Sequence, residues 1–101
     1  MRTVDMLRGV PEQAAGNGDG GDEAARRFAR LLVSEIKLYN EGAVRVGRQQ
    51  RDLSRRLRGE IERARRLYEE RVPPAVVARD AYFQQELVQT LAGGDASLLG
   101  N

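Results

Sequence analysis

The chain has 101 residues, the size of one small domain, and contains neither cysteine nor histidine. This composition excludes disulfides, thiolate chemistry and histidine catalysis and removes the commonest zinc ligands, so we expect a protein that is not an enzyme and holds no metal or cofactor. The 17 lysines and arginines exceed the 15 aspartates and glutamates by only two charges, which alone is weak evidence for a nucleic-acid partner.

Residues 1–21 are predicted to form a flexible N-terminal segment. Five glycines and one proline crowd it, and its only sizeable apolar side chains are Val4, Met6, Leu7 and Val10, too few to offset the entropy lost on ordering. The segment lacks the apolar core of a signal peptide, and no apolar run approaches the roughly 18 residues of a membrane span. We therefore expect a cytoplasmic chain that does not enter a membrane.

A helical domain is expected over residues 22–92, with its first helix over residues 22–46. Asp22 follows two glycines and is placed to cap that helix. Apolar residues then recur at the spacing of one helix face. They are Phe28, Leu31, Leu32, Ile36, Tyr39, Ala43 and Val46. The pattern predicts an amphipathic helix of about 24 residues, roughly 36 Å long.

The chain around residues 42–51 has two interpretations. Gly42 and Gly47 each cost about 1 kcal/mol inside a helix, and residues 47–51 lack apolar side chains, which favours a turn there with Asp52 capping the next helix. The alternative is one uninterrupted helix of about 50 residues, because a near-heptad run with a polar Gln50 crosses this stretch as in a coiled coil. That run is Tyr39, Ala43, Val46, Gln50, Leu53 and Leu57.

Two more helices are expected, over residues 52–72 and 75–92, separated by Pro73 and Pro74. The apolar stripe of the first is Leu53, Leu57, Ile61, Ala64, Leu67 and Tyr68. That of the second is Val76, Val77, Phe83, Leu87, Val88 and Leu91. Two glycines then stop the last helix, and residues 93–101 form a C-terminal tail.

These elements predict an all-α fold of two to three amphipathic helices, arranged as a helical hairpin or a three-helix bundle. A domain of this size buries only about 60% of its unfolded surface, and the chain has few aromatic residues. We expect self-association, a homodimer above all, to complete the burial of the helix stripes. The residues expected to take part are Phe28, Leu32, Ile36, Tyr39, Leu53, Leu57, Ile61 and Tyr68.

Glu35 stands out because it lies among the apolar residues of the first helix. An unpaired buried carboxylate is costly, so we expect a buried polar contact, either structural, with Arg65 or Tyr68 across a helical hairpin, or one that specifies a dimer. A ligand or metal carboxylate is the less favoured alternative, since no second inward carboxylate at Glu-x-x-His spacing is present.

Arginines dominate residues 45–71, with ten of them against five carboxylates. Their planar guanidinium groups suit phosphate, so a nucleic acid is the alternative partner. The carboxylates interleave at helical spacing, however, which is more typical of a solvated helix face, and no known nucleic-acid-binding motif is present. The candidates for an anionic partner are Arg48, Arg51, Arg55 and Arg58.

Two blocks of the sequence resemble a helical segment of uncharacterised bacterial proteins. They are RRFARLLVSEIKLYNE at residues 26–41 and YFQQELVQTLAGGDASLLG at residues 82–100. The segment occurs in deltaproteobacterial and acidobacterial sequences, alone or behind a cysteine-rich zinc ribbon, and the resemblance spans about residues 25–100. This chain lacks the ribbon's cysteines. The resemblance implies a bacterial helical module and carries no activity.

Taken together, these patterns predict a helical module for protein–protein interaction or assembly, an adaptor or regulatory protein with an unidentified protein partner.

Overall fold

The computed structural model describes residues 18–100, and every regular element in this range is helical. The five α-helices are α1 (Gly18–Tyr39), α2 (Glu41–Gln50), α3 (Leu53–Arg56), α4 (Arg58–Arg71) and α5 (Arg79–Glu86). A π-helix, η1 (Leu87–Leu91), continues α5, and a 3-10 helix, η2 (Ala96–Leu99), follows it. The all-α prediction is therefore confirmed, with more and shorter helices than the two or three expected.

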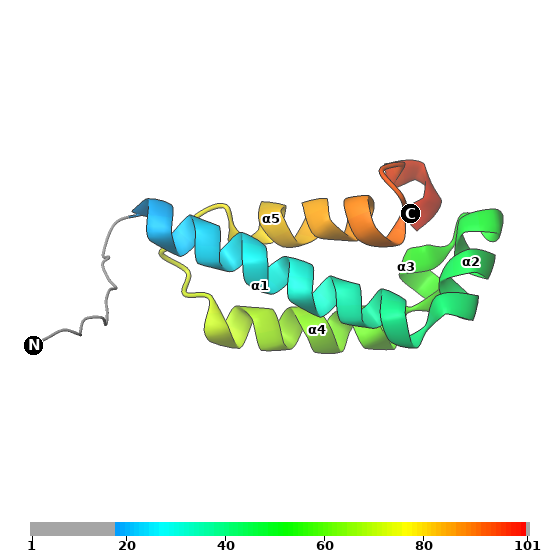
Figure 1. Ribbon diagram of the computed structural model, residues 1–101, viewed down its shortest axis with the longest axis horizontal. Helices are drawn as coiled ribbons and strands as arrows, with labels where there is room; N and C mark the ends of the chain where they lie inside the picture. Colours follow the sequence, from blue (N-terminus) through cyan, green and yellow to red (C-terminus); the bar gives the residue numbers. More distant parts are fainter. Residues whose placement is uncertain (1–17, 101) are drawn as a thin grey trace, which may run out of the picture.

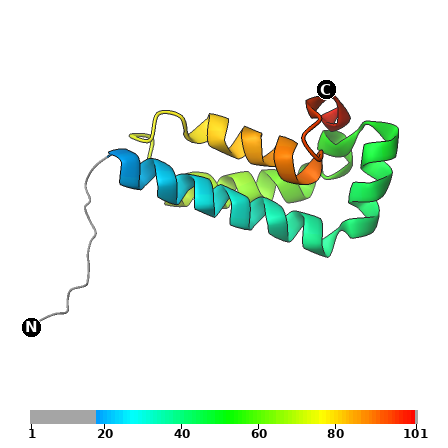
Figure 2. The same cartoon turned by 45° about the horizontal axis from the view of Figure 1, so that its top comes forward.

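Three helical segments of the chain lie side by side as an antiparallel bundle (Figures 1 and 2). Helix α1 contacts both α4 and the continuous segment α5–η1. At one end of the bundle, α2 turns away from α1 and packs with α3 against η2, which places the C-terminal residues beside the middle of the chain.

The core gathers small and large apolar side chains from every helix, with aromatic rings at one end. Tyr68 of α4 is fully buried between Phe28 of α1 and Phe83 of α5, with ring centroids 6.2 and 5.1 Å away. Its hydroxyl donates a 2.7 Å hydrogen bond to the backbone oxygen of Arg79, so the buried polar group is satisfied. This packing fixes how α1 and α4 are aligned along the bundle.

The first expected helix, residues 22–46, is wrong at both of its ends. The described chain is helical already from Gly18. Gly21 is part of this helix and lies close to Val76, since a Cβ added to Gly21 would be 3.5 Å from the Val76 side chain. The helix then breaks at Asn40, whose side-chain amide donates a 2.8 Å hydrogen bond to the backbone oxygen of Ile36. A side chain that bonds to the backbone in this way competes with the regular helix.

The alternative of one continuous helix through residues 42–51 is also wrong. Helix α2 persists through Gln50 and ends at Arg51, which adopts a left-handed conformation with φ of 57°. Gly47 is not the break: it lies inside α2, where an added Cβ would come within 2.6 Å of the Leu53 side chain. The glycine thus allows α2 and α3 to approach closely.

The other two expected helices also differ from those observed. Residues 52–72 are divided into α3 and α4 at the buried Leu57. The third helix begins at Arg79 rather than at residue 75, because turns follow the two prolines. The Arg79 guanidinium donates a hydrogen bond to the backbone oxygen of Val72, the residue that follows α4. The expected glycine stop is present, since Gly94 donates a 2.8 Å backbone hydrogen bond to Val88.

The two terminal predictions have different outcomes. Of the N-terminal segment predicted to be flexible, residues 1–17 lie outside the described residues, and for residues 18–21 the prediction is wrong because they belong to α1. Of the C-terminal tail, Leu99 is buried in the core, and Asp95 caps η2 by accepting hydrogen bonds from the amide and hydroxyl of Ser97. Those hydrogen bonds hold the pKa of the Asp95 carboxyl below its ordinary value.

Candidate interaction surface

The described residues offer little for catalysis by a bound metal. Within residues 18–100 no three acidic side chains gather in a way that could hold a metal ion. No described helix is long and apolar enough to cross a membrane.

Most of the residues expected to mediate self-association are buried within a single chain. Phe28 is half-buried and packs against the core, and Tyr39 is 77% exposed. The other six are buried: Leu32, Ile36, Leu53, Leu57, Ile61 and Tyr68. Since these side chains are already buried within one chain, any self-association must use apolar groups that the bundle leaves in solvent.

Such groups line one side of the bundle, along α1 and α4. On α1, Leu31 and Leu38 are 54% and 60% exposed and lie two turns apart on one side, with Tyr39 next to Leu38. On α4, Leu67 is 49% exposed. A shallow groove between the two helices has Leu32, Ile36 and Ala64 among its lining residues. We define the α1–α4 face as Leu31, Glu35, Leu38, Tyr39, Glu60, Arg63 and Leu67.

Glu35 belongs to this face, so the prediction that it makes a buried contact within one chain is wrong, whereas a contact that specifies a dimer stays a prediction. It is exposed and lines the groove together with Glu60 and Arg63. The partners expected for it are engaged elsewhere: the Arg65 guanidinium lies 4.7 Å from the centre of the Phe83 ring, and Tyr68 donates to the backbone. Glu35 lies at the border of the apolar stripe, and the packing of α4 beside Leu32 and Ile36 leaves its carboxylate in solvent.

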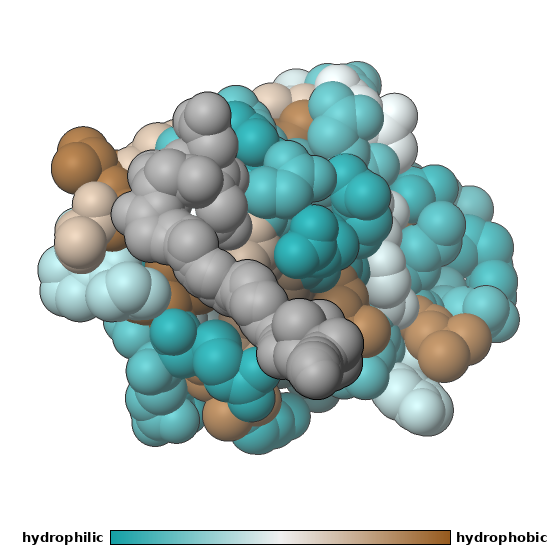
Figure 3. Space-filling view, turned by 60° about the vertical axis from the view of Figure 1, so that its left-hand side comes forward, coloured by the Kyte–Doolittle hydropathy of each residue, from teal (hydrophilic) through white to brown (hydrophobic). Residues whose placement is uncertain are grey.

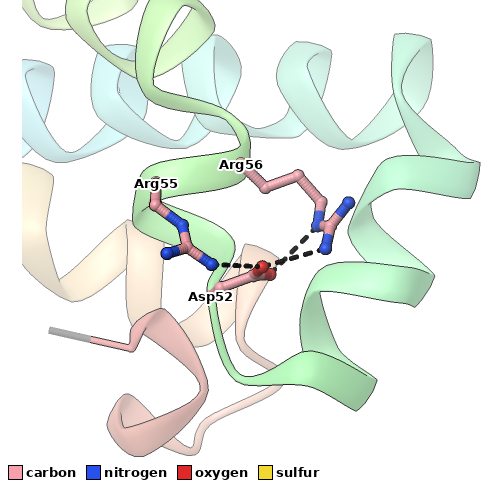
Figure 4. A network of polar contacts seen from close by, with 3 residues as sticks. All are labelled: Asp52, Arg55 and Arg56. Carbon is pink, nitrogen blue, oxygen red and sulfur yellow. Dashed lines mark hydrogen bonds and ion pairs between the residues drawn. The ribbon is translucent and has the colours of Figure 1, made fainter.

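The one carboxylate that the described fold does bury is Asp52, which is 8% exposed. Arg56 donates to its two oxygens at 3.0 and 2.9 Å, and Arg55 donates to Oδ2 at 3.2 Å (Figure 4). These bonds, those from Arg56 first, hold the pKa of Asp52 below its ordinary value of 3.8. Asp52 precedes α3 as expected, but its side chain binds arginines rather than capping the helix. The signal in the sequence is an aspartate three and four residues before two arginines.

The four arginines proposed for an anionic partner are largely engaged within the chain. Arg48 donates to the backbone oxygens of Leu91 and Thr90 at 2.7 and 3.1 Å, and Arg51 donates to the Ser97 hydroxyl at 2.9 Å. Arg55 pairs with Asp52, whereas Arg58 makes no ion pair with a described residue. Arg55 and Arg58 line one groove and Arg48 lines another, so the structure does not unite them in one footprint.

A second apolar groove lies at the end of the bundle where α1 begins. Among its lining residues are Ala24, Phe28, Pro73 and Val76, and the Arg71 guanidinium lies 4.7 Å from the centre of the Phe28 ring. Figure 3 brings this end forward and shows hydrophobic surface interrupted by hydrophilic side chains. The described residues at this end include no row of exposed leucines like that of the α1–α4 face.

No family model, no curated protein and no solved structure matches the chain. The resemblance to the bacterial helical segment therefore stays a prediction.

Proposed function

We propose that this chain is a non-enzymatic assembly module that self-associates through the α1–α4 face. The observation that supports it is the set of four large apolar side chains, each about half exposed or more, on one side of two adjacent helices. Fully burying an exposed side chain of this size is worth roughly 1.5–3 kcal/mol, and a side chain that is half exposed can still contribute about half of that in a complex. Several large apolar side chains exposed on one side of a small protein indicate an interaction site.

The charges on the same face fit an interface rather than a ligand pocket. Glu35, Glu60 and Arg63 make no ion pairs with described residues, so each is available to a partner. Interfaces combine an apolar centre with polar groups that find their partners across the contact. A surface that carries both acidic and basic groups can also complement itself, which a homodimer requires.

The nucleic-acid alternative has less support. Three of its four arginines already bind the chain's own carbonyl, hydroxyl or carboxylate oxygens. Phosphate binding would have to break these contacts or rely on Arg58 and scattered neighbours. We therefore propose protein assembly, and we expect no steeply salt-dependent binding to nucleic acid of the kind that phosphate contacts produce.

Solution mass measured by light scattering after size-exclusion chromatography tests the proposal. We expect the whole chain to be a dimer, and Leu67→Asp to shift it to monomer with its helical circular dichroism retained. Val77→Asp is the matched control, because Val77 is 92% exposed and lies outside the α1–α4 face. A wild-type chain that stays monomeric up to high micromolar concentration would rule out self-association as the function.

A further inference from the structure

We infer that in the assembled state α1 of one copy lies across α4 of the other, so that Glu35 pairs with the partner's Arg63. The inference rests on the proposed self-association and adds to it the relative arrangement of the two copies. It follows from how α1 and α4 are aligned within one chain.

The stacking of Phe28 on Tyr68 sets that alignment, since it places these two residues at the same level of the antiparallel helices. At 1.5 Å per residue, Leu31 lies about 4.5 Å further along the bundle and Leu67 about 1.5 Å. Counted from the same level of Phe28 and Tyr68, Glu35 lies about 10.5 Å along the bundle and Arg63 about 7.5 Å. Both pairs thus share a level to within about 3 Å: apolar with apolar, and carboxylate with guanidinium.

A two-fold axis that runs parallel to the helices, along the α1–α4 face, brings the residues that share a level into contact between the two copies. Such an axis places α1 over the partner's α4 and keeps every residue at its own level. Leu31 then meets the partner's Leu67, and Glu35 meets the partner's Arg63. Each contact occurs twice, and Glu35 and Arg63, neither of which makes an ion pair with a described residue, both gain one.

The other face-to-face arrangement has its two-fold axis across the helices. It would lay α1 on α1, and centring the axis between Leu31 and Leu38 would bring the two copies of Glu35 together near it. Like charges at a contact disfavour that arrangement. The face also has a suitable size: two helices, each about 10 Å across and up to about 33 Å long, present on the order of 600 Å², close to the roughly 800 Å² per partner of a standard interface.

Charge reversal at the two positions tests the arrangement. Glu35→Arg alone and Arg63→Glu alone each place like charges in both contacts, so we expect each variant to dimerise at least about tenfold more weakly than the wild type. Mixing the two variants makes both contacts complementary again. We therefore expect the mixture to form a one-to-one heterodimer with near wild-type affinity, measured by light scattering and native mass spectrometry.

Matched controls are two other charged residues of α4. Glu62→Arg and Arg66→Glu make the same charge changes at exposed positions outside the α1–α4 face, and we expect both to dimerise as the wild type does. Because all four positions are exposed, circular dichroism should show unchanged helicity.

The outcomes separate the two proposals. A monomeric wild type overturns the proposed function and this inference with it. A dimeric wild type with single variants that remain fully dimeric leaves self-association standing and overturns the arrangement. Single variants that dissociate but do not recombine on mixing also overturn the pairing of Glu35 with Arg63, while retaining the face as the contact.

Discussion

At the scale of single residues, Asp52 is a buried charge in the middle of the chain. Its carboxylate is buried beside the turn between α2 and α3 and accepts hydrogen bonds from Arg55 and Arg56. These bonds favour the ionised form, which is why the pKa of Asp52 is lowered. Its contribution to stability is therefore fully present above the ordinary pKa of 3.8 and is lost as the pH falls through the lower pKa of the folded state.

We expect Asp52→Asn to lower the urea midpoint of unfolding at pH 7, because the amide cannot replace a carboxylate held by two guanidinium groups. The difference from the wild type should shrink as the pH is lowered below about 4, because the wild-type carboxyl itself becomes protonated as the pH falls through its lowered pKa. Glu62→Gln, which removes an exposed carboxylate without an ion pair to a described residue, should leave the midpoint unchanged. An Asp52→Asn variant as stable as the wild type at pH 7 would show that the arginine pairing contributes nothing.

At the scale of elements, hydrophobic periodicity predicts that the chain is helical but not where the helices bend. The bend at Asn40 depends on a side chain that turns back to the Ile36 oxygen, and the end of α2 on a left-handed Arg51. Neither residue type is a strong helix breaker, so the pattern runs through both positions without a signal. Contacts between distant segments, such as that of Arg48 with η1, cannot be seen in local sequence at all.

Arg48 provides a test of such a contact. Its guanidinium joins α2 to the backbone oxygens of Thr90 and Leu91, at the end of η1. We expect Arg48→Met to destabilise the fold by about 1–3 kcal/mol and to speed amide hydrogen exchange in residues 92–100. Arg45→Met removes an exposed arginine of the same helix that makes no ion pair with a described residue, and should change stability by less than about 0.5 kcal/mol. Equal effects of the two substitutions would contradict a structural role for Arg48.

At the scale of the whole molecule, the sequence predicts which residues are apolar on a helix but not what covers them. The stripe pattern predicts Leu57 and Tyr68 at a contact between chains, yet both are buried inside one chain. The stripe pattern leaves Leu38 out, because it lies far around the helix from Leu32 and Ile36, and the structure leaves it 60% exposed. Only the number and placement of the helices around α1 decide which of these side chains reaches solvent.

This distinction predicts opposite outcomes for two similar substitutions. Leu57 is 2% exposed inside one chain, so Leu57→Asp should unfold it, since an unpaired buried charge costs a large part of the roughly 5–15 kcal/mol that stabilises a small domain. Leu38→Asp should instead separate the copies and leave each folded, because its carboxylate reaches water once the face is open. Circular dichroism and light scattering on both variants distinguish these results. A helical, monomeric Leu57→Asp chain would place that residue between copies after all. An unfolded Leu38→Asp chain would show that the exposed leucines of the α1–α4 face support the fold itself.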